Sequence, residues 1–125
     1  MAVMYVKKEF TFDAAHYLEK YHGKCERLHG HTYRLAITVK GEPDSEGMVM
    51  DFIELKEIVK EKVLSVLDHS CLNDIIPQPT TENVVLWIKE RLKPAIKGKN
   101  CSLSEIQLWE GSGSSIILKL ERVGE

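Results

Sequence analysis

Two histidines separated by one residue, His29 and His31, have the spacing in this sequence that most directly predicts chemistry. Side chains alternate between the two faces of a β-strand, so on a strand both imidazoles would lie on one face. The alternation of apolar and polar residues after them predicts such a strand over 31–40. Two neutral imidazoles on one face are a good start for a transition-metal site, and zinc is the usual ion. From this stretch alone, a pair of hydrogen-bonded core histidines beside an inert Cys25 is an equally good interpretation.

A third histidine, His16, ends another alternating segment, which predicts a strand over 6–16. If the two strands pair antiparallel, the end of the first lies beside the start of the second. His16 would then approach His29 and His31 on the same face. Three imidazoles with no evident fourth protein ligand are typical of an open catalytic zinc site rather than a closed structural one. This interpretation assumes the register, because a slip of one residue would turn His16 to the other face.

Two further groups carry side chains that could take part in proton transfer or ligand binding. Asp68 and His69 follow the expected end of a helix over 52–67. The pair is either a histidine at the negative end of the helix dipole or an imidazole that a carboxylate orients for proton transfer. Glu110 falls on the apolar side of a predicted strand, where a buried carboxylate needs a partner. That partner is either a Lys or Arg side chain or a ligand that offers N–H donors.

The elements that would position these groups follow one another as hairpin, two helices and hairpin. Apolar residues that recur every three or four positions predict an amphipathic helix over 52–67. A second helix, capped by Thr80 or Thr81, is predicted to end or bend at Pro94. Alternating segments on both sides of Gly111–Gly113 predict the last hairpin. This order predicts an α+β fold with one four-stranded antiparallel sheet and both helices on one of its faces.

Length, charge and cysteine usage limit the classes of protein to consider. The 125 residues predict a single domain over 1–125, and a net charge of −2 gives no argument for nucleic acid or an anionic membrane as partner. No apolar run approaches a membrane span, and Lys7, Lys8 and Glu9 interrupt the first apolar residues, so no secretory signal is predicted. Three cysteines without a C-x-x-C motif favour a reducing cytoplasm. The edges of a four-stranded sheet favour self-association.

The chain resembles the 6-pyruvoyl-tetrahydropterin synthase family through short blocks that occur in order along most of its length. The blocks are Phe12–His16, Cys25–His31 with Tyr33, Asp51 with Phe52, Leu67–His69 with Leu72 and Asn73, Pro79–Asn83, and Glu110. The spacing Cys-x-x-x-His-Gly-His resembles the 6-carboxy-5,6,7,8-tetrahydropterin synthase branch, since the pyruvoyl enzymes of animals have a longer gap. One departure is Gly111, where many relatives have Thr, so a hydroxyl contact to the pterin is missing or comes from elsewhere.

The resemblance implies a tunnelling fold, in which the sheets of several subunits join into a barrel. The typical assembly is a homohexamer of two trimers, with active sites at subunit interfaces. It also implies three groups of site residues, which bind zinc, transfer protons or contact the pterin. They are His16, His29 and His31 for Zn²⁺; Cys25, Asp68, His69 and Glu110 for catalysis; and Glu110 with Thr80, Thr81 and Glu82 for the substrate.

The activity implied by the resemblance is that of a zinc-dependent lyase. It would convert 7,8-dihydroneopterin triphosphate to 6-carboxy-5,6,7,8-tetrahydropterin and release acetaldehyde and triphosphate, in cytoplasmic 7-deazaguanine (queuosine or archaeosine) biosynthesis. One alternative is a 6-pyruvoyl-tetrahydropterin synthase, which eliminates triphosphate without cleaving the side chain. A more distant alternative is a non-enzymatic zinc- or pterin-binding module, against which stands the lack of an evident fourth ligand.

Overall fold

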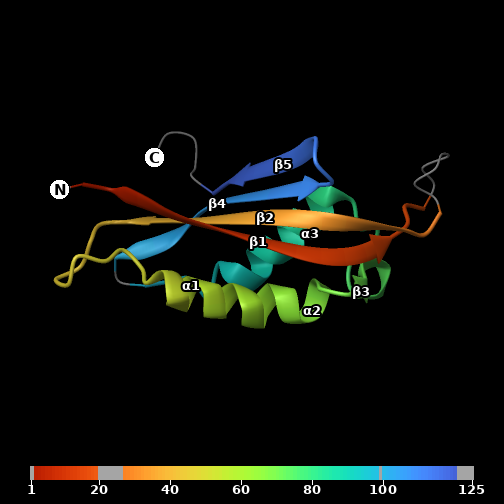
Figure 1. The fold of residues 1–125 in the computed structure, drawn as a ribbon. Coiled ribbons are helices and arrows are strands. Elements are labelled where there is room, and N and C mark those ends of the chain that lie inside the picture. Colours follow the sequence, from red (N-terminus) through yellow and green to blue (C-terminus); the bar gives the residue numbers. More distant parts are fainter. Residues whose placement is uncertain (1, 20–26, 99, 121–125) are drawn as a thin grey trace.

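The computed structural model describes residues 2–19, 27–98 and 100–120. Five strands and two helical segments make up this part of the chain, and short irregular turns join them (Figure 1). The elements are β1 (Met4–His16), β2 (His29–Gly41), α1 (Phe52–Val59), the π-helical turn η2 (Lys60–Leu64), α2 (Ser65–Leu67), β3 (Ser70–Cys71), the 3-10 turn η3 (Leu72–Asp74), α3 (Thr81–Leu92), β4 (Cys101–Glu110) and β5 (Ser114–Lys119).

The strands form one sheet in the order β3-β1-β2-β4-β5. All neighbours pair antiparallel except β3, which runs parallel to β1 and pairs with it at Ala14 and Ala15. The prediction of a four-stranded antiparallel sheet was therefore wrong by one strand. A strand of two residues is too short to show an alternating pattern, and its pairing depends on a contact with a residue more than fifty positions away.

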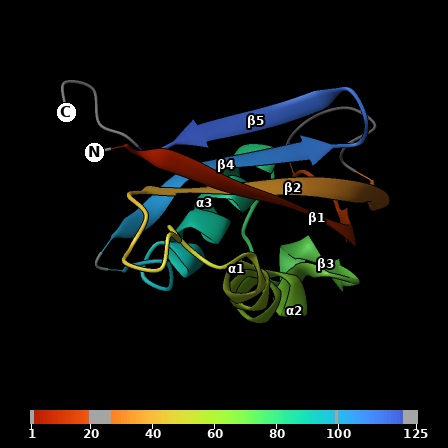
Figure 2. The same cartoon turned by 60° about the vertical axis from the view of Figure 1, so that its left-hand side comes forward.

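Both helical segments cover the same face of the sheet, as predicted (Figures 1 and 2). The first runs without interruption from α1 through η2 to α2, and Asp51 begins it by accepting a hydrogen bond from the backbone N–H of Ile53 at 2.8 Å. The second, α3, begins at Thr80, whose hydroxyl accepts from the backbone N–H of Asn83 at 3.1 Å. No helix in the described ranges is long and apolar enough to cross a membrane.

The hydrophobic core lies between this helical layer and the sheet. Buried and exposed residues alternate toward the end of β1 and along most of β4, which is the pattern of a sheet with one covered face. In the central strand β2, the consecutive residues from Leu35 to Val39 are all buried. The largest fully buried side chains are Phe12, Tyr33, Leu35, Ile37, Leu55, Leu67, Leu72, Ile88, Leu92, Ile96, Ile106 and Leu108. Because the buried residues of β1 near its end include Phe12 and Ala14, the next residue on that face, His16, is directed into the interior.

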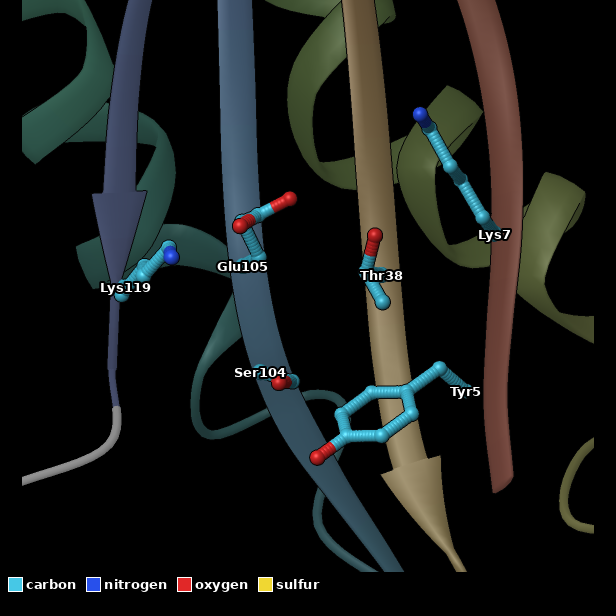
Figure 3. A pocket seen from close by; sticks show the side chains of 6 residues that line it. All are labelled: Tyr5, Lys7, Thr38, Ser104, Glu105 and Lys119. Carbon is cyan, nitrogen blue, oxygen red and sulfur yellow. The ribbon is translucent and has the colours of Figure 1, made fainter.

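The other face of the sheet is polar, and none of the described helices covers it. A hollow of about 440 Å³ lies on this face. Figure 3 shows the side chains that line it, with the helices behind the strands. Its lining residues are Tyr5, Lys7, Thr38, Ser104, Glu105 and Lys119. The pairing of β2 with β4 shifts by one residue between Thr38 and Val39, so Ser104 is an extra residue at this point of β4. The hollow therefore lies at a β-bulge, since Thr38, Ser104 and Glu105 all line it.

Candidate active site

Three histidines from β1 and β2 meet at one end of the sheet. His16 pairs directly with His29, and Ala14 pairs with His31, which is the register that the sequence argument required. His16 is 1% exposed, whereas His29 and His31 are partly exposed. The ring centroids are 4.6 Å apart for His16 and His29, 4.7 Å for His29 and His31, and 5.1 Å for His16 and His31. The three imidazoles therefore form one compact group.

Backbone carbonyls fix the orientation of two of these rings. His16 Nδ1 lies 2.8 Å from the carbonyl oxygen of Pro79, and His29 Nδ1 lies 2.7 Å from that of Arg27. A carbonyl can only accept, so each Nδ1 carries the hydrogen and donates it. In a neutral ring the lone pair is then on Nε2. The two Nε2 atoms are only 3.0 Å apart, so their lone pairs repel each other. A proton or a metal ion between or beside the two atoms would offset this repulsion.

The third ring, His31, offers a nitrogen that has no hydrogen-bond partner. Its Nε2 atom is buried and lies 3.2 Å from Glu110 Oε1, within ion-pair range but without hydrogen-bond geometry. Burial lowers the pKa of His31, and the nearby charges of His16 and His29 lower it further, while Glu110 raises it. The lowered pKa favours the neutral ring, which is the form that binds a metal ion.

The three histidines together fit a single metal ion. One nitrogen from each ring lies within 4.8 Å of the others. The donor set of three imidazoles, with backbone carbonyls holding two of the rings from behind, is typical of catalytic zinc sites. The unpartnered nitrogen of His31 is what such a site needs, because an orphaned buried polar atom is otherwise unfavourable.

Glu110, at the end of β4, lies beside this group. Its side chain is 27% exposed, and its Oε2 atom lies 4.0 Å from His16 Nε2 and accepts a hydrogen bond from the hydroxyl of Thr81 at 2.8 Å. The sequence left open a Lys or Arg partner for this carboxylate. Within the described residues its ion-pair partners are instead His16 and His31.

The three other residues that the resemblance assigns to the substrate, Thr80, Thr81 and Glu82, have different surroundings. The Thr80 hydroxyl is engaged in capping α3, so only Thr81 of the two threonines directs its hydroxyl to Glu110. Glu82 lies in the first turn of α3 and is exposed. The contact between Thr81 and Glu110 was not foreseen, although the two residues belong to blocks of the same resemblance.

Asp68 and His69 lie in a separate group. Asp68 Oδ1 is 3.1 Å from His69 Nδ1 and accepts from the backbone N–H of Asp13 at 3.0 Å. The His69 side chain is 79% exposed, and its backbone has a φ of 61°, in the left-handed region. Asp13 is on the exposed face of β1, whereas His16 is on its buried face. The structure therefore does not bring this pair into the group of three histidines, although His31 and His69 line the same open hollow of about 480 Å³.

The cysteines differ in what can be said of them. Cys25 lies outside the described residues, so its predicted place beside the histidines is not observed. Cys71 and Cys101 are both partly buried and free. Burial raises the pKa of the Cys101 thiol, and the charge of Glu54 raises it further. Cys101 is thus poorly suited to act as a thiolate at neutral pH.

Comparison with known proteins identifies relatives along nearly the whole chain. A family model described as 6-pyruvoyl tetrahydropterin synthase matches residues 5–121. A dihydroneopterin monophosphate aldolase of Pyrococcus furiosus is 43% identical over 109 residues, which cover 87% of this chain and 91% of the relative. A 6-carboxy-5,6,7,8-tetrahydropterin synthase of Haemophilus influenzae is 36% identical over 131 residues, covering 84% and 91%. The structure of the Caenorhabditis elegans 6-pyruvoyl tetrahydropterin synthase superposes with a TM-score of 0.85 at 26% identity, covering 97% of this chain and 98% of that one.

Proposed function

Because the chain belongs to the 6-pyruvoyl tetrahydropterin synthase family, we propose that it is a zinc-dependent pterin lyase. Its substrate is 7,8-dihydroneopterin triphosphate, and its products are 6-carboxy-5,6,7,8-tetrahydropterin, acetaldehyde and triphosphate. The observation that carries this proposal is the convergence of His16, His29 and His31, with two ring nitrogens 3.0 Å apart. The tight Cys-x-x-x-His-Gly-His spacing, which resembles the 6-carboxy branch, also supports it.

His16, His29 and His31 would hold the zinc ion. When bound, the ion supplies positive charge that stabilises negative charge on the substrate's side-chain oxygens and favours the thiolate of a neighbouring cysteine. The carbonyls of Pro79 and Arg27 keep two of the rings in the orientation that directs Nε2 to the ion.

The remaining residues bind the pterin and move protons. Glu110 accepts two N–H groups from the aminopyrimidine edge of the pterin, and the hydroxyl of Thr81 holds one of its oxygens in place. Cys25 removes a carbon-bound proton that conjugation with the pterin ring makes acidic. His69, oriented by Asp68, carries the paired proton.

Because His69 lies apart from the three histidines of its own chain, we propose that it acts in the active site of a neighbouring subunit. We place the active site at the interface of a homohexamer of two trimers, where the exposed His69 of one subunit reaches the pterin held by another. In the described residues, the outer edge of β5 and most of the outer edge of β1 have no strand partner, which favours edge-to-edge association into a barrel. The cellular role we propose is cytoplasmic queuosine or archaeosine biosynthesis.

A second candidate function is the aldolase reaction on 7,8-dihydroneopterin monophosphate. The high identity to the Pyrococcus furiosus relative favours it. That reaction also breaks a carbon–carbon bond of the pterin side chain, and the same metal site and proton-transfer groups would serve it. The phosphate group of the preferred substrate and the product, a 6-carboxy or a 6-hydroxymethyl pterin, distinguish the two candidates.

Product analysis with both substrates tests these proposals. The zinc-loaded protein is incubated separately with the triphosphate and the monophosphate, and the pterins are identified by mass. We expect the 6-carboxy product and acetaldehyde from the triphosphate. A 6-hydroxymethyl pterin from the monophosphate would favour the aldolase instead, and a 6-pyruvoyl product would favour the synthase without side-chain cleavage. Turnover of neither substrate would contradict a pterin lyase.

A further inference from the structure

The pair of Asp68 and His69 is extended by a second carboxylate, that of Asp13 in β1. One ligand atom from each of the three side chains lies within 4.8 Å of the others. The backbone of Asp13 also holds the pair: its N–H donates to Asp68 Oδ1 at 3.0 Å, and its carbonyl accepts from the His69 N–H at 2.6 Å. The backbone of Asp13 thus fixes the position of the Asp68 carboxylate and of the His69 backbone, which has a left-handed conformation.

The carboxylate of Asp13 is itself held in place. Asp13 and Thr32 are directly opposite each other in the pairing of β1 with β2, and both point to the exposed face of the sheet. The Thr32 hydroxyl donates to Asp13 Oδ1 at 2.6 Å. A surface carboxylate usually samples several rotamers, so this hydrogen bond keeps the charge of Asp13 near His69.

Two neighbouring carboxylates restrict the state of one imidazole. His69 Nδ1 lies 3.1 Å from Asp68 Oδ1, and because a carboxylate only accepts hydrogen bonds, this nitrogen must carry the hydrogen. The negative charge of Asp13, whose carboxylate lies farther from the ring, favours the same N–H. If His69 carried its hydrogen on Nε2, the lone pair of Nδ1 would face Asp68, while an oxygen of Asp13 lies within 4.8 Å of a nitrogen of the same ring. Both carboxylates therefore disfavour the wrong tautomer.

We infer that Asp13 is a positioning residue, which together with Asp68 holds His69 in the Nδ1–H tautomer and leaves Nε2 to exchange protons with a substrate. The inference rests on the proposed function only for its effect on turnover. Thr32 takes part by fixing the Asp13 carboxylate. The tautomer of His69 is a property of the free protein and can be measured without any pterin.

The ¹⁵N chemical shifts of the His69 imidazole test the inference directly. The signal is assigned by its loss in His69→Gln and is recorded at a pH where the ring is neutral. We expect mainly the Nδ1–H tautomer in the wild type and a shift toward Nε2–H, which prevails in free histidine, in Asp13→Ala. Thr11→Val, a change on the same exposed face of β1, should leave the shifts unchanged. Identical tautomer populations in the wild type and Asp13→Ala would overturn the inference.

A double-mutant cycle tests the consequence for turnover. Asp13→Ala should lower kcat roughly threefold to fivefold, the size expected for an exposed charge interaction, with little change in KM. The same substitution in a His69→Ala background should have no further effect, because Asp13 acts through His69. An equal loss in both backgrounds would indicate a merely structural role and overturn the inference.

The Thr32 hydroxyl offers a further, conservative comparison. Thr32→Ser keeps the donor to Asp13 and should retain kcat, whereas Thr32→Val should lower it in the same direction as Asp13→Ala. If Thr32→Ser and Thr32→Val lower kcat equally, the hydroxyl does not act through Asp13. If the wild type turns over neither pterin, the proposed function fails, and the ¹⁵N shifts alone decide the role of Asp13.

Discussion

His16 Nε2 lies 3.0 Å from His29 Nε2, although the Nδ1 atom of each ring faces a backbone carbonyl. Two neutral rings in this arrangement would direct their lone pairs at each other. The arrangement is favourable only with positive charge beside both nitrogens. His31 adds a third nitrogen without a hydrogen-bond partner. These nitrogens are therefore the ligands that we propose for one metal ion.

The two adjacent threonines before and in α3 should respond differently to substitution. Thr80→Ala removes the N-cap hydrogen bond and should lower the free energy of unfolding by about 1 kcal/mol. Thr81→Ala removes a contact to Glu110 near the surface and should cost less than about 0.5 kcal/mol but raise KM for the pterin. Urea unfolding and steady-state kinetics on both variants check this. A larger loss of stability in Thr81→Ala than in Thr80→Ala would contradict it.

Replacing Glu110 should weaken pterin binding while metal is retained. Glu110→Gln removes the charge that accepts the pterin N–H groups, and hydrogen bonds to charged groups are strong enough that KM should rise about tenfold or more. Glu105→Gln is the matched control, since it makes the same change in β4 on the opposite face of the sheet. Steady-state kinetics and metal analysis on both variants check this. Equal KM values for Glu110→Gln and the wild type would remove Glu110 from the pterin site.

The thiol of Cys101 should react slowly with alkylating reagents near neutral pH. Burial raises its pKa above the ordinary value of 9.0, so less thiolate is present at a given pH. Its iodoacetamide rate, measured by peptide mass mapping at pH 8, should be lower in the folded protein than in urea. By linkage, the stability due to this group is present below the unfolded pKa and is lost as the pH rises through the folded one. Equal rates in the folded and unfolded protein would contradict the shift.

The pattern of the sequence predicts the parts of the site that depend on one regular strand pair. Alternation in two segments places His16, His29 and His31 on one face, and a hairpin brings their ends together. The capping residues Asp51 and Thr80 are also recognisable, because an N-cap depends on residues only a few positions away.

Contacts between distant segments could not be predicted in the same way. The strand β3 has two residues and no periodic signal, and it pairs with the distant residues Ala14 and Ala15 of β1. The backbone N–H of His69, just before β3, donates to the carbonyl of Asp13. The proximity of Asp13 to His69 could therefore not be predicted from the sequence pattern. The hydrogen bond from Thr81 to Glu110 joins a helix and a strand separated by 29 positions, so its existence depends on how the helix packs on the sheet.

Metal analysis of two histidine variants tests the central claim most directly. The protein is loaded with zinc, freed of excess ion by gel filtration, and analysed by mass spectrometry for metal per chain. We predict one zinc per chain in the wild type and in His69→Ala, and a loss of nearly all zinc in His29→Ala. His69→Ala is the control because it removes an imidazole from the separate group with Asp13 and Asp68. A full zinc content in His29→Ala, or its loss in His69→Ala, would contradict the assignment of the metal to His16, His29 and His31.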